Sequence, residues 1–372
     1  MIKLQLSNIK KFNLFVFFTM FAKYSVELFM PVILYKLNYN LTHILLYLLI
    51  TSLLNIIVSI PATKFGKKYG FKYLIIISAF IFIAMYFLVG ILKKNVIYFL
   101  LVSLLSSLTN VFYYIGRHNY AGVVLENQKI GKKVGGILIA TILANMLSSI
   151  FSSIMLDRFS KIFIAIIATI IYLIGVLFIY KIKEEKVQEK HTLKEISKKI
   201  KFSNKIFFVL EQFKIIFFSL YPLYIYIFVD NSYSYIGLLY LITGLASIVF
   251  IYFFSLKIDE NDNLNYLKIS AILLSSILLL DMIISNKYLV LIIVFLEGIF
   301  IKLYETTVTN ILYALRGQKE GSSYFLYMEI LYNISRIFII TFFLIFSFKI
   351  RTILYICLLF ILLSGFIKIE YE

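Results

Sequence analysis

Long apolar runs separated by short polar segments fill almost the whole chain. A helix that crosses a bilayer needs about 20 mainly apolar residues. On that rule the first half of the chain predicts spans at 12–35, 41–62, 73–92, 96–116, 134–156 and 161–181. The second half predicts spans at 206–229, 235–256, 266–285, 288–313, 323–347 and 350–369. We therefore expect an all-α membrane protein with twelve transmembrane helices.

The one long charged segment, residues 181–205, divides two apolar blocks of similar length. Thr192 followed by Glu195 is a capping-box pattern, which predicts the start of a helix. Apolar side chains then recur at helical spacing, at Leu193, Ile196 and Ile200. The segment is therefore a linker, either a solvated connection or a short helix on the membrane surface.

An internal repeat relates the two apolar blocks. Aligning Pro31 with Pro222 also aligns Lys23 with Lys214, and each proline is followed by a second apolar run. The chain has only three prolines, so this match carries more weight than the alignment of apolar residues. Duplicated halves are typical of transporters built from structural repeats. The predicted organisation is two six-helix bundles, at 1–181 and 206–372, joined by a cytoplasmic basic linker at 182–205.

The distribution of positive charge predicts the orientation. Most of the 37 Lys and Arg residues lie at the two ends, in the linker and in every second loop. Cytoplasmic segments carry such an excess, so we expect both termini and the linker in the cytoplasm. The first apolar run is longer than the apolar core of a signal peptide and lacks a small-residue cleavage site. We expect it to remain as a spanning helix.

Composition excludes several classes of protein. Hydrophobic residues make up 62% of the chain and charged residues 15%, which does not fit an ordinary soluble domain. The net charge of +18 is better explained by loop lysines that set orientation than by nucleic-acid binding. A single cysteine, Cys357, and three scattered histidines predict neither a disulfide nor a metal site.

The loop after the second predicted span, residues 63–72, reads TKFGKKYGFK. With twelve spans, a basic linker and duplicated halves, the whole chain resembles the major facilitator superfamily, whose pattern in this loop is G-x-L-A-D-R-x-G-R-K. Lys68, Gly70 and Lys72 match that pattern, whereas Thr63 replaces its first glycine and Lys67 its acidic residue. The resemblance implies a transporter that works by alternating access between its two bundles.

Ionisable residues inside the predicted spans are the main functional candidates, because a charge near the bilayer centre costs at least about 2.5 kcal/mol on insertion scales. Lys23 and Glu27 stand four residues apart in the first span, and Glu211 and Lys214 three apart in the seventh. Each pair can form an ion pair within its own helix. Two interpretations remain open: ion pairs that only hold helices together, and groups that line a path for solute or protons.

The tenth and eleventh spans are the most polar of all. The tenth carries Glu297, Lys302 and Glu305. The eleventh carries Glu329, Asn333 and Arg336 along one stripe of the helix. For Arg336 the alternatives are an ion pair with Glu297 on the neighbouring helix and binding of a solute.

Two further candidates lie on a polar stripe of the fourth span, at Asn110 and Arg117. Serine and threonine in such stripes mostly serve helix packing, so they are not taken as site residues. Arg117 lies at the cytoplasmic end of the span. Its alternative role is to reach a lipid phosphate.

These features predict a secondary-active transporter that moves a small solute through the cell membrane. Coupling to a proton carried by Glu27 or Glu297 is one mechanism, and uncoupled facilitated diffusion is the other. The alternatives are a membrane-embedded glycolipid-type transferase or polymerase and a transporter-derived receptor or scaffold. Short outer loops with few carboxylates argue against an enzyme. We expect a monomer that contacts lipid and its solute, without nucleic acid, metal or cofactor.

Overall fold

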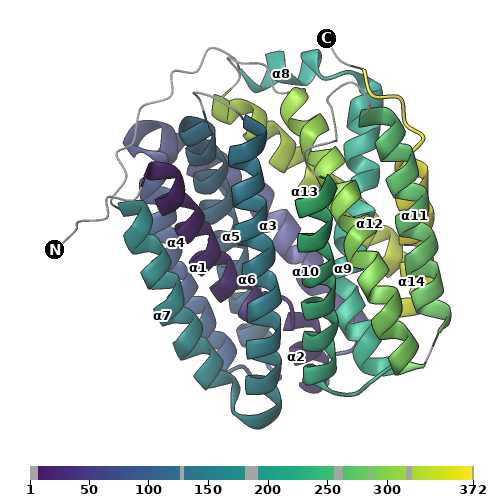
Figure 1. Cartoon of the computed structure of the whole chain (residues 1–372). Helices are drawn as coiled ribbons and strands as arrows, with labels where there is room; N and C mark the ends of the chain where they lie inside the picture. The colour runs from purple at the N-terminus through teal and green to yellow at the C-terminus, as the bar shows by residue number, and fades with distance from the viewer. Residues whose placement is uncertain are drawn as a thin grey trace.

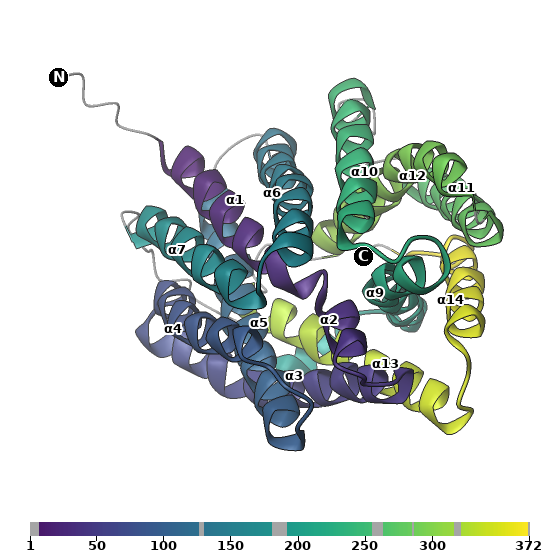
Figure 2. The ribbon, with the colours of Figure 1, turned by 90° about the horizontal axis from the view of Figure 1, so that it is seen from below.

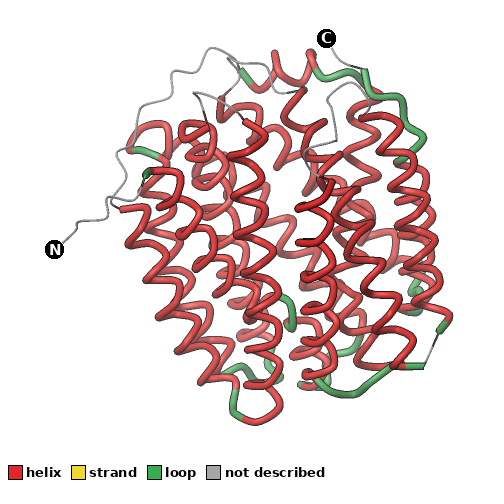
Figure 3. Tube along the Cα trace, in the orientation of Figure 1, coloured by secondary structure: helices red, strands yellow, loops and turns green. Residues whose placement is uncertain are grey.

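The computed structural model describes residues 7–125, 130–180, 192–254, 263–284, 286–315 and 321–370. Every regular element in these ranges is a helix, as Figure 3 shows. The helices before the linker are α1 (Asn8–Glu27), α2 (Met30–Lys36), α3 (Leu41–Tyr69), α4 (Phe71–Gly90), α5 (Val96–Leu125), α6 (Ile130–Arg158) and α7 (Lys161–Tyr180). After them come α8 (Leu193–Lys199), α9 (Phe202–Phe228), α10 (Tyr233–Phe254), α11 (Asn263–Ile283), α12 (Lys287–Ala314), α13 (Gly321–Ile345) and α14 (Ile350–Ser364).

Ten of the twelve predicted spans are helices long and apolar enough to cross a membrane, with α1 and α2 counted together. The two remaining predictions also fall on helices. The first, α12, is 28 residues long but carries Glu297, Lys302 and Glu305. The second, α14, has 15 residues. The chain is thus an all-helical membrane protein.

The first predicted span is not one continuous helix. It divides at residues 28–29, where α1 ends and α2 begins with Pro31 in its first turn. Proline has no N–H to donate to the carbonyl four residues earlier, which here belongs to Glu27. Its repeat partner Pro222 lies inside the uninterrupted α9. The two aligned prolines therefore have different structural effects.

The second span extends past its predicted end at residue 62. The hydropathy rule stops there because lysines follow, but α3 continues to Tyr69. It ends at Gly70, whose φ of 115° is strained for any residue with a Cβ. The Gly70 N–H donates to the carbonyl of Gly66 at 2.8 Å, and α4 starts directly afterwards.

Helices of each half pack mainly with one another. In the first half α1 lies between α6 and α7, and α5 packs on α3 and α4. In the second half α12 packs on α10 and α11, and α9 on α13 and α14. The two halves meet where α6 packs along α10 and α3 along α13, which is seen in Figures 1 and 2.

The linker contains a short helix, α8, which begins with the predicted capping box. The Thr192 side chain accepts from the Glu195 N–H, and the Glu195 side chain accepts from the Thr192 N–H. Ile196 is buried and α8 packs on α13, so the helix is held on the end of the molecule that we call the linker end. Residues 181–191 of the predicted linker lie outside the described residues.

The last described residues return to the linker end. Glu370 forms an ion pair with Lys201 at 3.2 Å and accepts from the Ser203 hydroxyl. These two hydrogen bonds lower the pKa of the exposed Glu370 carboxyl. The Asn204 side chain donates to the Glu370 backbone carbonyl, so the C-terminal segment lies against the start of α9.

Candidate functional site

Lys23 is the centre of a polar cluster in the first half. It is completely buried, and its Nζ donates to Glu27 Oε1 at 2.9 Å and to Asn110 Oδ1 on α5. The ammonium lies 5.1 Å from the ring centres of both Tyr113 and Tyr114. The predicted ion pair of the first span is therefore present, and Asn110 joins it. We call Lys23, Glu27 and Asn110 the first-half cluster.

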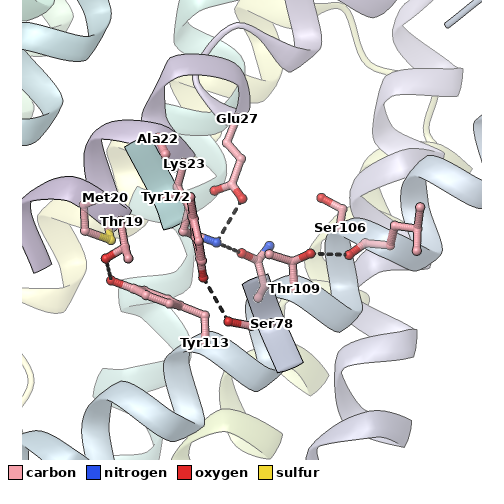
Figure 4. A network of polar contacts seen from close by, with 12 residues as sticks. Thr19, Met20, Ala22, Lys23, Glu27, Ser78, Ser106, Thr109, Tyr113 and Tyr172 are labelled. Carbon is pink, nitrogen blue, oxygen red and sulfur yellow. Dashed lines mark hydrogen bonds and ion pairs between the residues drawn. The ribbon is translucent and has the colours of Figure 1, made fainter. Parts of the chain in front are cut away.

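Hydroxyl groups around this cluster join its helices, as Figure 4 shows. Thr19 on α1 and Tyr113 on α5 form a hydrogen bond of 2.9 Å. Ser78 on α4 and Tyr172 on α7 form another of the same length. All four side chains are buried, so these bonds fix α1 and its lysine in a rigid surrounding.

Arg117 points inward rather than toward lipid. Its guanidinium donates to the Thr141 hydroxyl on α6 at 3.3 Å and contacts the Met20 sulfur on α1 at 3.5 Å. It also lies over the Tyr113 ring at 6.0 Å. These contacts place Arg117 among α1, α5 and α6, beside the first-half cluster.

A continuous network of charged and polar side chains crosses the second half from α12 through α9 to α13. Lys302 pairs with Glu305 at 3.2 Å, Glu305 with Lys214 at 3.8 Å, and Lys214 with Glu211 at 2.9 Å. Gln212 then donates to Glu211 at 2.7 Å and accepts from Arg336 at 2.8 Å. We call these six residues the second-half network. It confirms the Glu211–Lys214 pair predicted within the seventh span.

Arg336 does not pair with Glu297. The depth of the two residues along their helices made that ion pair a plausible alternative, but in the described structure the Arg336 Nε donates to Gln212 instead. The partner lies on α9, because α13 packs on α9 and on α3. The packing of helices against one another, which residue spacing does not predict, determines the side chain to which Arg336 donates.

A chain of polar hydrogen bonds links the two halves near the middle of α3 and α13. Asn55 on α3 donates to Asn333 on α13 at 3.1 Å and accepts from Ser107 on α5 at 2.8 Å. Asn333 also donates to Glu329 Oε1 at 2.8 Å, as expected for residues on one stripe of the helix. Asn333 is completely buried, so its amide has no water to replace this bond. The polar stripe of α13 therefore contacts the first half through α3.

Two carboxylates near the middle of their spans remain accessible. The Glu305 side chain is 39% exposed and the Glu27 side chain 23% exposed, although both are held by buried lysines. Tyr24 on α1 lies within electrostatic reach of both Arg117 and Glu305. The first-half cluster and the second-half network thus approach the boundary between the halves from its two sides. They offer a solute both cationic and anionic groups.

A separate pair of carboxyls lies inside the second half. Asp281 on α11 is completely buried and accepts from the Tyr221 hydroxyl at 2.7 Å, while Glu297 on α12 is 2% exposed. Glu297 was predicted as a candidate, whereas Asp281 and Tyr221 were not. The sequence signal for Asp281 is its position inside the predicted span 266–285, where a carboxylate is costly.

The predicted motif residues lie at the linker end, with Lys67 and Lys68 in the last turn of α3 and Lys72 at the start of α4. Lys67 donates to the Ser323 hydroxyl on α13 at 3.3 Å, a contact between halves. Lys68 lies over the Tyr69 ring at 4.9 Å, and Lys72 donates to the carbonyl of Tyr180 on α7. Lys67, which replaces the acidic residue of the family pattern, thus contacts the second half through a neutral hydroxyl.

The two halves also contact each other at the end away from the linker, and the sequence did not predict these contacts. Asp157 at the end of α6 accepts from the backbone N–H groups of Tyr233 and Ser234 at the start of α10, at 3.3 and 2.7 Å. Lys36 of α2 lies 4.1 Å from the centre of the Tyr233 ring. Phe29 packs edge-on against that ring at 5.6 Å. These residues close the boundary at the end away from the linker.

Within the described ranges, no group of three or more His, Cys, Asp or Glu residues is arranged to hold a metal. Cys357 is a free, completely buried thiol on α14. The polar groups of the site are carboxylates, amines, amides and hydroxyls, which suit solute and proton binding.

A family model described as Major Facilitator Superfamily matches residues 12–340. The match begins in α1 and ends in α13, so it covers nearly all of the helices described above. No curated protein matches the chain.

Proposed function

The chain belongs to the major facilitator superfamily and is thus a multi-pass secondary transporter, and we propose that it moves a small solute by alternating access between two six-helix bundles. The bundles are residues 1–181 and 206–372, and the linker at 182–205 allows their relative motion. The family is generally non-enzymatic, which agrees with the expectation that the chain is not an enzyme. The glycolipid-transferase alternative is therefore dropped.

The observation that carries this proposal is the position of the accessible carboxylates. Glu27 and Glu305 lie near the middle of their spans, beside the boundary between the halves, and are still exposed in part. A side chain of this kind on a lipid-facing surface would be costly, so these groups face a hydrated interior. A solute that enters from either side would meet them.

The residues proposed to contact solute or protons come from both bundles. From the first they are Lys23, Glu27, Asn110 and Arg117. From the second they are Glu211, Lys214, Glu297, Lys302, Glu305, Glu329, Asn333 and Arg336. The contacts at the two ends, Lys67 with Ser323 and Asp157 with α10, are proposed to break in turn as the bundles rock.

The proposed topology has twelve spans with both termini and the linker in the cytoplasm of a monomer in the plasma membrane. It is supported by the excess of Lys and Arg on that side and by the return of Glu370 to the linker end. Reporter fusions at the linker and at the turn near Asn286 should report opposite sides of the membrane. Reporters on one and the same side would refute the topology.

Proton coupling is proposed through Glu27 or Glu297. A protonatable carboxyl that exchanges a proton in each cycle links solute movement to the pH gradient. Glu27→Gln and Glu297→Gln should separate the two, because the variant at the true carrier loses pH-driven accumulation in proteoliposomes yet keeps exchange of solute for solute. Unchanged accumulation in both variants would remove these residues from coupling and favour facilitated diffusion.

A further inference from the structure

Three buried polar side chains inside the second half, apart from the second-half network, lie within electrostatic reach of one another. They are Tyr221 on α9, Asp281 on α11 and Glu297 on α12, all with exposed fractions of 3% or less. Tyr221 donates its hydroxyl to Asp281 Oδ2 at 2.7 Å. Asp281 and Glu297 are near enough to interact electrostatically. We call these residues the acid pocket.

Two carboxyl oxygens of the acid pocket accept no hydrogen bond in the described structure. Among the described residues, Asp281 Oδ1 and Glu297 Oε2 have no hydrogen-bond partner, although both atoms are cut off from solvent. A buried carboxylate oxygen without a partner is costly, and such atoms in folded proteins call for an explanation. A proton held by one of the two carboxyls is the simplest one.

In the described parts of the chain, no ion pair joins a lysine or arginine to Asp281 or Glu297. Tyr240 on α10 lies within electrostatic reach of Glu297, and Tyr224 on α9 donates to the Met282 carbonyl beside Asp281. Arg351 on α14 lies over the Phe228 ring at 4.2 Å and near Tyr224, and the described ion pairs include none between it and either carboxyl. Two neighbouring carboxyls in such a dry place cannot both ionise.

We infer that the acid pocket holds one exchangeable proton, carried by Glu297 with Asp281 as its ionised neighbour. Asp281 is assigned the negative charge because the Tyr221 hydroxyl donates to it, and a hydrogen bond to a carboxylate favours its charged form. A proton fits better than a metal cation, since hard cations take about six or more oxygen ligands. Of the described side chains here, Asp281 and Tyr221 are the pair within hydrogen-bond distance of each other, and they do not form such a shell.

This inference rests on the proposed function for one consequence only, that the pocket is the coupling site. Glu27 is ion-paired with the ammonium of Lys23, whereas no ion pair of Glu297 is found in the described structure. Tyr221 and Asp281 then act as positioning residues that set how tightly Glu297 holds its proton. The presence of the proton itself can be measured without any solute.

The test is infrared spectroscopy of the purified full-length protein in lipid, without solute, through the carbonyl stretch of a protonated carboxylic acid. Wild-type protein at neutral pH should show this band, and the band should shift when H2O is replaced by D2O. Glu297→Gln, whose amide resembles the neutral acid in shape, should lose it. The matched control Glu305→Gln should keep it, because Glu305 is ion-paired with two lysines.

Two tyrosines one turn apart on α9 give a second matched comparison. Tyr221→Phe removes the donor to Asp281, so Asp281 should share the proton with Glu297 and the carbonyl band should change in frequency. Tyr224→Phe removes a hydroxyl that donates to the Met282 backbone, and should leave the band unchanged. Melting temperatures of all variants show whether each is folded.

Three results would overturn the inference. The first is wild-type protein without the band at neutral pH, and the second is a band that persists in both Glu297→Gln and Asp281→Asn. The third is a rise in melting temperature with sodium over choline chloride that is lost in Glu297→Gln, because the pocket would then bind a metal cation. A normal band in a protein that fails to accumulate solute would refute the coupling role and leave the proton site intact.

Discussion

The Lys214→Met variant should lose about 3–5 kcal/mol of unfolding free energy, the usual cost of breaking a buried ion pair by removing one partner. The Lys214 and Glu211 side chains are only 6% and 9% exposed, so water cannot solvate the carboxylate that is left behind. Lys214 also pairs with Glu305, which ties α9 to α12. Reversible unfolding of the purified protein in detergent measures the loss.

Removing both charges separates stability from function. Lys214→Met combined with Glu211→Met leaves no uncompensated charge at that point and should recover most of the stability. Solute uptake should stay low in the double variant if the network is part of the path. Lys287→Met is the control, because its pair with Asp230 at 3.6 Å is exposed and contributes no more than about 1 kcal/mol. Full uptake by the double variant would make the network purely structural.

Compared with Lys214→Met, Lys23→Met should reduce transport more and the free energy of unfolding less. Without the ammonium, Glu27 and Asn110 lose the donor that they share, so uptake should fall about 30-fold, which corresponds to about 2 kcal/mol. The Glu27 side chain left behind is 23% exposed and can be solvated, so the loss of stability should stay near about 1–3 kcal/mol. Uptake into proteoliposomes and melting temperature, measured together, check this split.

The matched control for Lys23 is Lys268→Met. It makes the same chemical change at an exposed position, where the ammonium lies 5.1 Å from the centre of the Phe366 ring. Uptake by this variant should match the parent. If Lys23→Met transports normally while unfolding at a lower temperature, the first-half cluster only holds α1 against α5.

Contacts within one helix could be predicted from the sequence. The Lys23–Glu27 and Glu211–Lys214 pairs, the capping box of α8 and the stripe on α13 all follow from spacings of three or four residues. The apolar runs likewise gave the positions of the helices. In each case the geometry of a single helix fixes which side chains can touch.

Contacts between helices could not be predicted in the same way. Arg336 bonds to Gln212 and not to Glu297, and Asn55 bonds to Asn333, because of how α3, α9 and α13 pack. The first span breaks at Pro31 while α9 continues through Pro222, although the two prolines are aligned in the repeat. Proline removes one hydrogen bond in both helices, and the surrounding packing decides whether the helix divides.

The central claim, that the mid-membrane site opens to each side in turn, can be tested without knowing the solute. Thr309 lies one turn after Glu305 and donates to its backbone carbonyl at 2.7 Å, so it reports on the same face of α12. The measurement is labelling of Thr309→Cys, in a Cys357→Ala background, by a membrane-impermeant thiol reagent. Right-side-out and inside-out vesicles are compared, and Ile292→Cys, 65% exposed on the same helix, serves as the lipid-facing control.

The account predicts that Thr309→Cys reacts in vesicles of both orientations while Ile292→Cys reacts in neither. Reaction from one side only would show a site that never changes access. Absence of reaction from both sides would show a closed interior, as in a receptor or scaffold, and either result would contradict transport by alternating access.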